Sequence, residues 1–210
     1  MSILYLASPQ GLTVRTEVAE ERSVSHQSAR IMRVRSSGGA PELVMEVPRL
    51  GNCACPRGPS DVCFLGQSTE DGKKLVISAF DPMQGNAREV LTLDIYAGAL
   101  YNWMPSPDGS RIVFMDYNPM EGNIRLLSLK GEPERDIVVK GWAGFNSVDW
   151  AADGKSLFVS SQSPTSSTLL HVDLEGHATP LWDQRGAWRT WAIRRSKRPR
   201  IGNPGYDQRQ

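Results

Sequence analysis

The sequence has only three cysteines and three histidines among its 210 residues, and it contains no long apolar run. The cysteines stand at positions 53, 55 and 63, and the nearest histidine is His26. A structural zinc site needs four such ligands, usually with a Cys-x-x-Cys pair, so this spacing argues against zinc. No apolar stretch approaches the roughly 20 residues that cross a bilayer. The opening segment Met1–Ala7 is apolar but has no basic leader, so we expect neither a membrane span nor a signal peptide in this sequence.

Catalytic motifs are missing as well. No Gly-x-Ser-x-Gly segment is present, and His26, His171 and His177 do not cluster in the sequence. A nucleophilic triad needs a serine positioned beside a base and its orienting acid. We expect His171 to pack within a strand and His177 to be solvated in a turn. The sequence therefore predicts no catalytic residue, no metal site and no cofactor, and the protein is not expected to be an enzyme.

The charge is nearly balanced overall but uneven along the chain. Net charge is +1, with 22% of residues charged, which is typical of an ordinary globular protein. The segment from Trp188 to Gln210 holds seven basic residues and one acid, a charge of +6 that leaves −5 for the rest. Such a block predicts a disordered tail over 194–210. Contact of this tail with phosphate groups of nucleic acid or lipid is the less favoured alternative.

Three stretches share one pattern, in which Asp-Gly is followed by two polar and three apolar residues. They are Glu70–Ile77, Pro107–Phe114 and Ala152–Val159, and their aspartates Asp71, Asp108 and Asp153 lie 37 and 45 residues apart. Asp-Gly favours a tight turn, and the apolar residues predict a buried strand. A connection rich in Asn, Pro or Gly and another strand follow each copy. A period near 40 built from strands and turns is typical of a β-propeller blade, and the aspartates are then turn residues and not ligands.

The pattern predicts an all-β protein, a β-propeller of four-stranded antiparallel blades that forms an incomplete ring of about four blades. We expect a partial blade at 1–50, blades at about 60–98, 99–141 and 142–186, and the start of a further blade at 187–193. No Asp-Gly turn precedes Ile3–Ala7, so the chain is expected to begin inside a blade. This suggests a fragment of a longer propeller or a change of reading frame. The six tryptophans are expected mostly in the core, with one or two at the channel mouth: Trp103, Trp142, Trp150, Trp182, Trp188 and Trp191.

The segment Trp103–Phe114, with its Ser-Pro-Asp-Gly, resembles the repeat of TolB-like propellers, also called WD40-like PD40 repeats. Asp149–Gly154 is a weaker copy without Ser-Pro, and Glu70–Gly72 is weaker again. The region from Arg30 to Trp191 also resembles the C-terminal sensor propeller of bacterial Ser/Thr protein kinases and winged-helix regulators. The kinase motifs themselves are absent from the sequence.

These resemblances imply a non-catalytic module that binds or senses a protein or small ligand at the channel mouth, with nucleic acid not expected as a partner. In a larger bacterial signalling protein, such binding would influence an attached kinase or DNA-binding domain. Two alternatives are the accessory propeller of a prolyl-oligopeptidase-like serine peptidase and a TolB-like envelope scaffold for protein interactions. The full reading frame would distinguish the three.

A disulfide between Cys55 and Cys63 is the favoured interpretation of the cysteines, with free thiols as the alternative. The loop between them holds enough Gly and Pro to bring its ends together, and similar propellers often carry such a pair. A disulfide would imply an oxidising compartment. That would agree with the extracytoplasmic location that the resemblance implies.

Overall fold

The computed structural model describes residues 2–7, 28–57, 61–96, 99–117 and 122–185, and within them the secondary structure is entirely β. The predicted further blade at 187–193, the basic tail at 194–210, His26, Trp188 and Trp191 lie outside the described residues. No described segment forms an apolar helix long enough to cross a membrane.

Fifteen strands form four successive antiparallel sheets. Within each sheet, strands that lie side by side are also consecutive in the sequence. The first sheet contains β1 (Ser2–Ala7), β2 (Ser28–Arg35) and β3 (Glu42–Pro48). The second contains β4 (Leu50–Ala54), β5 (Cys63–Ser68), β6 (Lys74–Phe80) and β7 (Ala87–Asp94). The third contains β8 (Tyr101–Pro105), β9 (Arg111–Asp116), β10 (Asn123–Ser128) and β11 (Arg135–Val138). The fourth contains β12 (Phe145–Trp150), β13 (Ser156–Gln162), β14 (Ser166–Asp173) and β15 (Ala178–Arg185).

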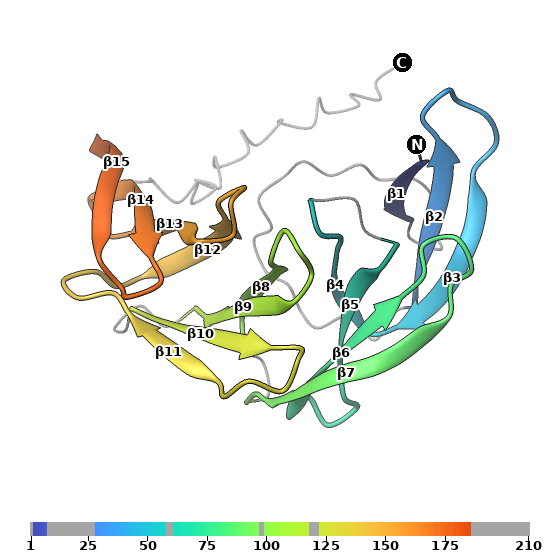
Figure 1. The fold of residues 1–210 in the computed structure, drawn as a ribbon, viewed down its shortest axis with the longest axis horizontal. Helices are drawn as coiled ribbons and strands as arrows, with labels where there is room; N and C mark the ends of the chain where they lie inside the picture. Colours follow the sequence, from blue (N-terminus) through green and yellow to red (C-terminus); the bar gives the residue numbers. More distant parts are fainter. Residues whose placement is uncertain (1, 8–27, 58–60, 97–98, 118–121, 186–210) are drawn as a thin grey trace, which may run out of the picture.

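The four sheets stand one after another along an open arc (Figure 1). Strands β4, β8 and β12 lie on the inner side of the arc, and β7 and β11 lie on its outer side. The first and fourth sheets stand at the two ends of the arc. The predicted all-β class with four-stranded antiparallel sheets is confirmed.

Apolar side chains fill the space between neighbouring sheets, and β9 shows how. Ile112 and Phe114 pack toward the second sheet, while Val113 and Met115 pack toward the fourth. Successive strand residues point to opposite faces, so a strand with a neighbouring sheet on each face needs a continuous apolar run. Three clusters of this kind join the four sheets face to face.

Two tryptophans anchor these clusters. Trp103 and Trp150 are fully buried, and Trp142 packs partly buried at the edge of its cluster. The indole of Trp103 lies against Gly66 of β5, where a Cβ atom would come within 2.9 Å of the ring. The prediction that most tryptophans lie in the core is thus confirmed for Trp103 and Trp150, whereas Trp182, on the last strand of its sheet, is 54% exposed.

The predicted Asp-Gly turns form, and the aspartates organise them. The Asp108 carboxylate accepts hydrogen bonds from Ser106 Oγ at 2.6 Å, Ser110 N at 3.1 Å and Ser110 Oγ at 2.7 Å. Asp71 repeats the arrangement with Thr69 Oγ1 at 2.6 Å and Lys73 N at 3.1 Å. Asp153 accepts from Lys155 N at 2.9 Å. Their role as turn residues is therefore confirmed.

The three turns do not occupy equivalent places, which corrects the predicted repeat. Asp108 and Asp153 connect the first and second strands of their sheets, whereas Asp71 connects β5 and β6, the second and third. The second sheet begins at Leu50, not near residue 60. Its first strand, Leu50–Ala54, was missed because Gly, Asn and Cys interrupt it and no β-branched residue marks it. An Asp-Gly turn can connect the first and second strands of a sheet or the second and third. The motif alone therefore does not predict which two strands it connects.

Two glycines in equivalent hairpins allow a test of how closely the sheets approach. Gly131 and Gly176 precede the last strands of the third and fourth sheets, with φ of +84° and +90°. A Cβ at Gly131 would meet no atom within 4 Å, whereas one at Gly176 would overlap the carbonyl oxygen of Val138 in β11. We expect Gly131→Ala to cost about 1–2 kcal/mol of unfolding free energy from its positive φ alone. Gly176→Ala should cost about 1–3 kcal/mol more, because it also overpacks the contact between sheets.

Urea denaturation of both variants measures the difference. Equal losses would contradict the close contact between the Gly176 turn and β11.

The turn around Asp108 should also make stability depend on pH. Hydrogen bonds from Ser106 and then Ser110 lower the pKa of Asp108 from 3.8 to about 2. A carboxyl whose folded pKa is depressed stabilises the protein above its unfolded pKa, and this contribution is lost as pH falls through the folded value. Asp108→Asn should therefore be less stable than wild type above pH ~4, and the gap should close toward pH ~2. Urea midpoints between pH 2 and 6 test this, and parallel curves would refute it.

Candidate functional site at the inner rim

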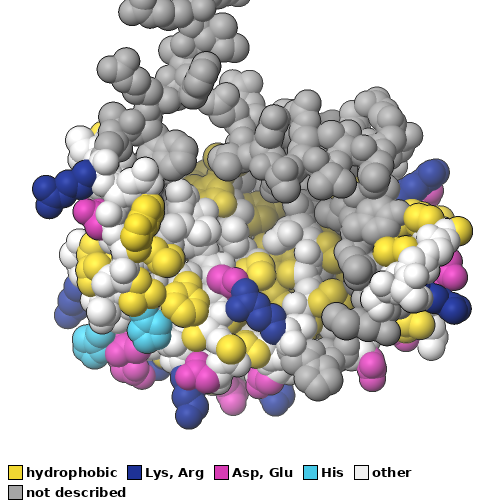
Figure 2. Space-filling view, turned by 90° about the horizontal axis from the view of Figure 1, so that it is seen from above, with side chains coloured by type: hydrophobic (Ala, Val, Ile, Leu, Met, Phe, Trp, Pro, Cys, Tyr) yellow, Lys and Arg dark blue, Asp and Glu magenta, His cyan; other side chains and the backbone are white. Residues whose placement is uncertain are grey.

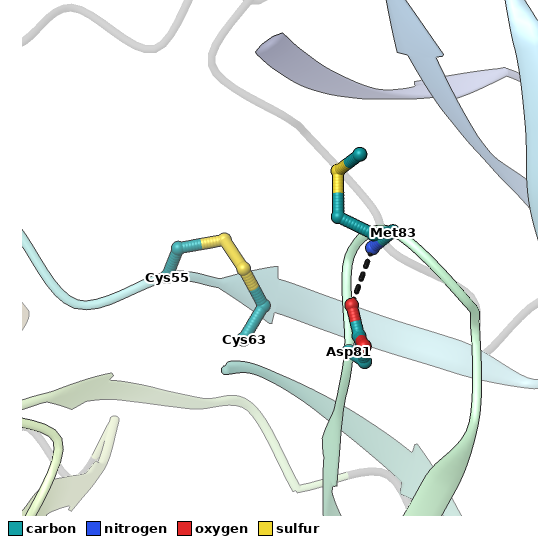
Figure 3. The surroundings of a disulfide bond; sticks show 4 residues. All are labelled: Cys55, Cys63, Asp81 and Met83. Atoms are coloured by element: carbon teal, nitrogen blue, oxygen red, sulfur yellow. Dashed lines mark hydrogen bonds between the residues drawn. A yellow bond between two sulfur atoms is a disulfide. The ribbon is translucent and has the colours of Figure 1, made fainter. Parts of the chain in front are cut away.

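The first hairpin of the second sheet is closed by a disulfide instead of an Asp-Gly turn. Cys55 and Cys63 are bonded, with their Cα atoms 4.2 Å apart, which confirms the favoured pairing. Figure 3 shows the bond together with the β6–β7 turn of the same sheet, where Met83 N donates to Asp81 Oδ1 at 2.6 Å. Cys53 remains a free thiol, and burial raises its pKa to about 11. A thiol of that pKa is protonated and unreactive near neutral pH.

The disulfide loop reaches from the second sheet toward the fourth. Pro56 packs on the first turn of the third sheet, where a Cβ at Gly109 would lie 3.2 Å from Pro56 Cγ. Arg57 continues past that turn, and its Nη1 donates to the carbonyl oxygen of Trp150 at 3.1 Å. Its Nη2 forms an ion pair with the carboxylate of Asp149. One side chain thus connects two sheets that are not neighbours.

A second arginine approaches the same place from the third sheet. The guanidinium carbon of Arg111 lies 5.0 Å from the centre of the Trp150 ring, and its Nη2 donates to Gly154 O at 2.9 Å. The Trp150 indole N–H donates to Met104 O at 3.1 Å, which fixes the ring. We call Arg57, Arg111, Asp149 and Trp150 the inner-rim cluster, because they sit at or beside the first hairpins that end the inner strands.

The inner-rim cluster presents charge to solvent. The side chains of Arg57 and Asp149 are 55% and 38% exposed, whereas Trp150 is buried beneath them. An exposed ion pair of this kind contributes at most about 1 kcal/mol to stability, so it can be exchanged for a ligand at little cost. A guanidinium presents a planar fork that suits carboxylates. Figure 2, which looks onto the open side of the arc, shows acidic and basic side chains beside one another among hydrophobic ones.

A polar groove on the third sheet, beside the segment that follows β7, is a concave site separate from the inner-rim cluster. It is lined by Tyr96, Phe114, Met115, Asp116, Asn123, Arg125 and Asp136. Burial raises the pKa of Asp116, and the nearby Arg125 acts in the opposite direction. Arg125 is already paired with Glu134 at 2.9 Å, and its guanidinium lies 5.8 Å from the Phe114 ring. The groove offers no second exposed arginine, so the inner rim is the stronger candidate.

The described histidines belong to the fourth sheet, with His171 on β14 and His177 in the turn before β15. His171 Nε2 is 2.8 Å from Ser156 Oγ, and its ring packs at a tilt against Phe158. His177 is exposed in its turn and lies 2.8 Å from Asp173, as expected for a solvated residue. The described residues contain no group of three or more His, Cys, Asp or Glu side chains that could hold a metal ion.

Sequence reasoning missed the inner-rim cluster. Trp150 was the only member considered for a channel mouth, and it supports the rim from beneath without being exposed. In the sequence, Arg57 is the one basic residue inside the Cys55–Cys63 loop, and Asp149 directly precedes Trp150, but neither was predicted as a site residue. Nothing in the sequence indicated that these two side chains would meet across 92 residues.

The disulfide should control the contact between Arg57 and Asp149. In a double-mutant cycle with Arg57→Gln and Asp149→Asn, we expect a coupling energy of about 0.5–1 kcal/mol in the oxidised protein. After mild reduction of the disulfide, or in a background with Cys55→Ser and Cys63→Ser, the coupling should fall to zero because the loop no longer holds Arg57 in place.

The exposed pair of Arg30 and Glu46, at 2.8 Å in the first sheet, is the matched control, and its coupling should not respond to reduction. Persistence of the Arg57–Asp149 coupling after reduction would contradict the role of the disulfide.

No family model matches this chain, and no curated protein matches its sequence. Solved structures do resemble it. One is TolB from Acinetobacter baumannii, with a TM-score of 0.56 and 15% identity over 86% of this chain. Another is a chain of a nidogen/laminin complex, with a TM-score of 0.57 and 10% identity over 89% of this chain. A third, hydrazine synthase from Kuenenia stuttgartiensis, has a TM-score of 0.50 and 14% identity over 75% of this chain.

The chain spans only 41% of the TolB chain and 64% of the nidogen/laminin chain. At these identities the similarity concerns the fold, and the sheets on an open arc agree with it. The protein therefore has a β-propeller fold, of which the described residues form four sheets.

Proposed function

We propose that this chain is a non-catalytic propeller module that binds a protein segment at its inner rim. The observation that carries the proposal is Arg57, which a disulfide loop holds at the inner rim with more than half of its side chain exposed. Binding residues are commonly found on loops that a rigid scaffold positions. Here the scaffold is the set of packed sheets, and the disulfide removes freedom from the loop that would otherwise be lost on binding.

The charges of the inner-rim cluster indicate which class of ligand it would bind. Arg57 and Arg111 place two cationic groups around Trp150, and only Asp149 opposes them within the cluster. A carboxylate of a peptide can take the place of Asp149 on the guanidinium of Arg57, exchanging one charged hydrogen bond for another. We therefore assign an acidic peptide segment, with a Glu or Asp side chain as its anchor.

The wider context of the module is a further part of the proposal. The resemblance to sensor propellers suggests that such binding, in a longer signalling protein, would influence an attached kinase or DNA-binding domain. The likeness to TolB supports the related alternative of a scaffold for protein interactions. The disulfide supports an oxidising, extracytoplasmic compartment for either one. A hydrolase domain encoded beside the module would favour the serine peptidase alternative instead.

Selection of random peptides on the oxidised protein tests the binding proposal. We expect selected peptides to share an acidic residue and to bind with micromolar dissociation constants in calorimetry, which is ordinary for short segments on a small site. Arg57→Glu should weaken this binding at least tenfold, because it puts a carboxylate against the anchor of the peptide. Reduction of the disulfide should weaken it as well.

Arg88→Glu provides the matched control, because it makes the same charge change at an exposed position on the outer strand β7. Peptides without an acidic residue, or equal losses for Arg57→Glu and Arg88→Glu, would overturn the proposal.

A further inference from the structure

The groove on the third sheet lies on the face that this sheet turns toward the second sheet. It encloses about 200 Å3, and Phe114, one of its lining residues, packs in the cluster that joins these two sheets. Phe114 is paired with Arg125, and Arg125 is paired with Asp136, so the three residues stand side by side on β9, β10 and β11 (Figure 1). Asp116 follows Phe114 by two residues on β9 and therefore lies on the same face.

Negative charge dominates this groove. Asp116 and Asp136 line it together with a single arginine, Arg125. That arginine already forms an ion pair with Glu134, at 2.9 Å. Three carboxylates therefore stand against one guanidinium, which leaves two negative charges in excess. We call the site the acidic groove, and a cleft lined by an excess of one sign of charge favours a ligand of the other sign.

Asp116 has the carboxylate that would gain most from a cationic ligand. The residue is partly buried, and burial raises the pKa of its carboxyl, which Arg125 only partly opposes. No hydrogen bond to this carboxylate forms within the described part of the chain, whereas Asp108 accepts three. Removing a charged group from water without such bonds costs free energy. A positively charged donor that enters the groove would offset this cost.

An exposed aromatic ring borders the acidic groove. Tyr96, from the segment after β7, lines the groove and is 61% exposed. Its carbonyl oxygen accepts a hydrogen bond from Ala99 N at 2.9 Å, so a turn positions its backbone. An ammonium group is attracted to the face of an aromatic ring as well as to a carboxylate. The groove is smaller than the ~300–1,000 Å3 of sites for drug-sized ligands, so its size suits a single flexible side chain or a small amine.

We propose that the acidic groove binds a protonated primary amine, carried by a lysine side chain or by a free aliphatic amine. The ammonium group donates to the carboxylate of Asp116, Asp136 adds attraction from the outer strand, and Tyr96 contacts the aliphatic chain. Asp116 ends β9, whereas Arg111 of the inner-rim cluster begins it, so the two sites lie at opposite ends of that strand. The protein thus binds a cationic group at one end of β9 and an acidic ligand at the other.

Titration of the full chain with two matched probes, followed by two-dimensional NMR, tests this proposal. The probes are Nα-acetyl-lysine amide and Nα-acetyl-norleucine amide, whose side chains are similar in length, and only the first ends in an ammonium group. We expect the lysine probe to bind with a dissociation constant of about 1 mM or below, and the norleucine probe to bind about tenfold more weakly. Equal binding of the two probes would overturn the proposal.

Cadaverine, a free aliphatic diamine, identifies the source of the amine. Binding of both cadaverine and the lysine probe assigns an amine in either form, and binding of only one of them assigns that form. Binding of neither at concentrations up to ~20 mM would overturn the proposal.

Variants then locate the bound amine. Asp116→Asn keeps the shape of the side chain and removes its charge, so it should weaken binding of the lysine probe about tenfold. Asp136→Asn should weaken it about threefold, because a more distant and exposed charge is screened by solvent and salt. Tyr96→Ala should also weaken binding, whereas Tyr96→Phe, which keeps the ring, should not.

Glu132→Gln provides the matched control. It removes a carboxylate from the same sheet, but in the hairpin that connects β10 to β11, and it should leave binding unchanged. Equal losses for Asp116→Asn and Glu132→Gln would indicate a general effect of charge and would overturn the proposal. Circular dichroism checks that each variant keeps its β spectrum, and the comparison of the two probes on the wild type needs no variant.

Discussion

The packing of one sheet face against the next is the constraint on which this structure depends. The central strands carry apolar side chains on both faces, and the alternation along β9 sends Ile112 and Phe114 one way and Val113 and Met115 the other. A sheet of four short strands cannot bury both faces by itself, so each sheet depends on its neighbours. Among the described residues, the second and third sheets each pack against two neighbouring sheets, and the first and fourth sheets each pack against one.

Two kinds of connection join the first two strands of these sheets, an Asp-Gly turn and a disulfide-closed loop. In the third and fourth sheets an Asp-Gly turn joins the first two strands through bonds from Ser106 and Lys155 to the aspartates. In the second sheet the Cys55–Cys63 disulfide closes the equivalent hairpin around a longer loop. This longer loop extends past the third sheet, so Arg57 can form its ion pair with Asp149 of the fourth sheet.

The inner rim illustrates how a general scaffold acquires a particular surface. The ring of Trp150 is buried in the core, and its backbone carbonyl oxygen accepts a hydrogen bond from Arg57 at the inner rim. Arg111 lies over the same ring and bonds to the turn at Gly154. The fold by itself does not fix a ligand, since propellers carry many unrelated functions. The two exposed charges of Arg57 and Asp149 give this one its chemical character.

The sequence by itself determined the class of the fold and the local chemistry of its turns. The Asp-Gly pairs and the apolar runs after them act over a few residues, so the strands β6, β9 and β13 and the roles of Asp71, Asp108 and Asp153 were predictable. The Cys55–Cys63 pairing was favoured for a similar reason, because a short loop rich in Gly and Pro separates the two residues.

Only the tertiary structure decided where each turn lies within its sheet and which distant residues meet. The turns at Asp71 and Asp108 share two hydrogen bonds to the aspartate, one from the hydroxyl two residues before it and one from the backbone N–H two residues after it. The turn at Asp71 nevertheless joins the second and third strands, because the weakly marked strand Leu50–Ala54 pairs ahead of it. The contact between Arg57 and Asp149 likewise depends on the separation of the second and fourth sheets. That separation comes from the packing of whole sheets, which no local pattern in the sequence records.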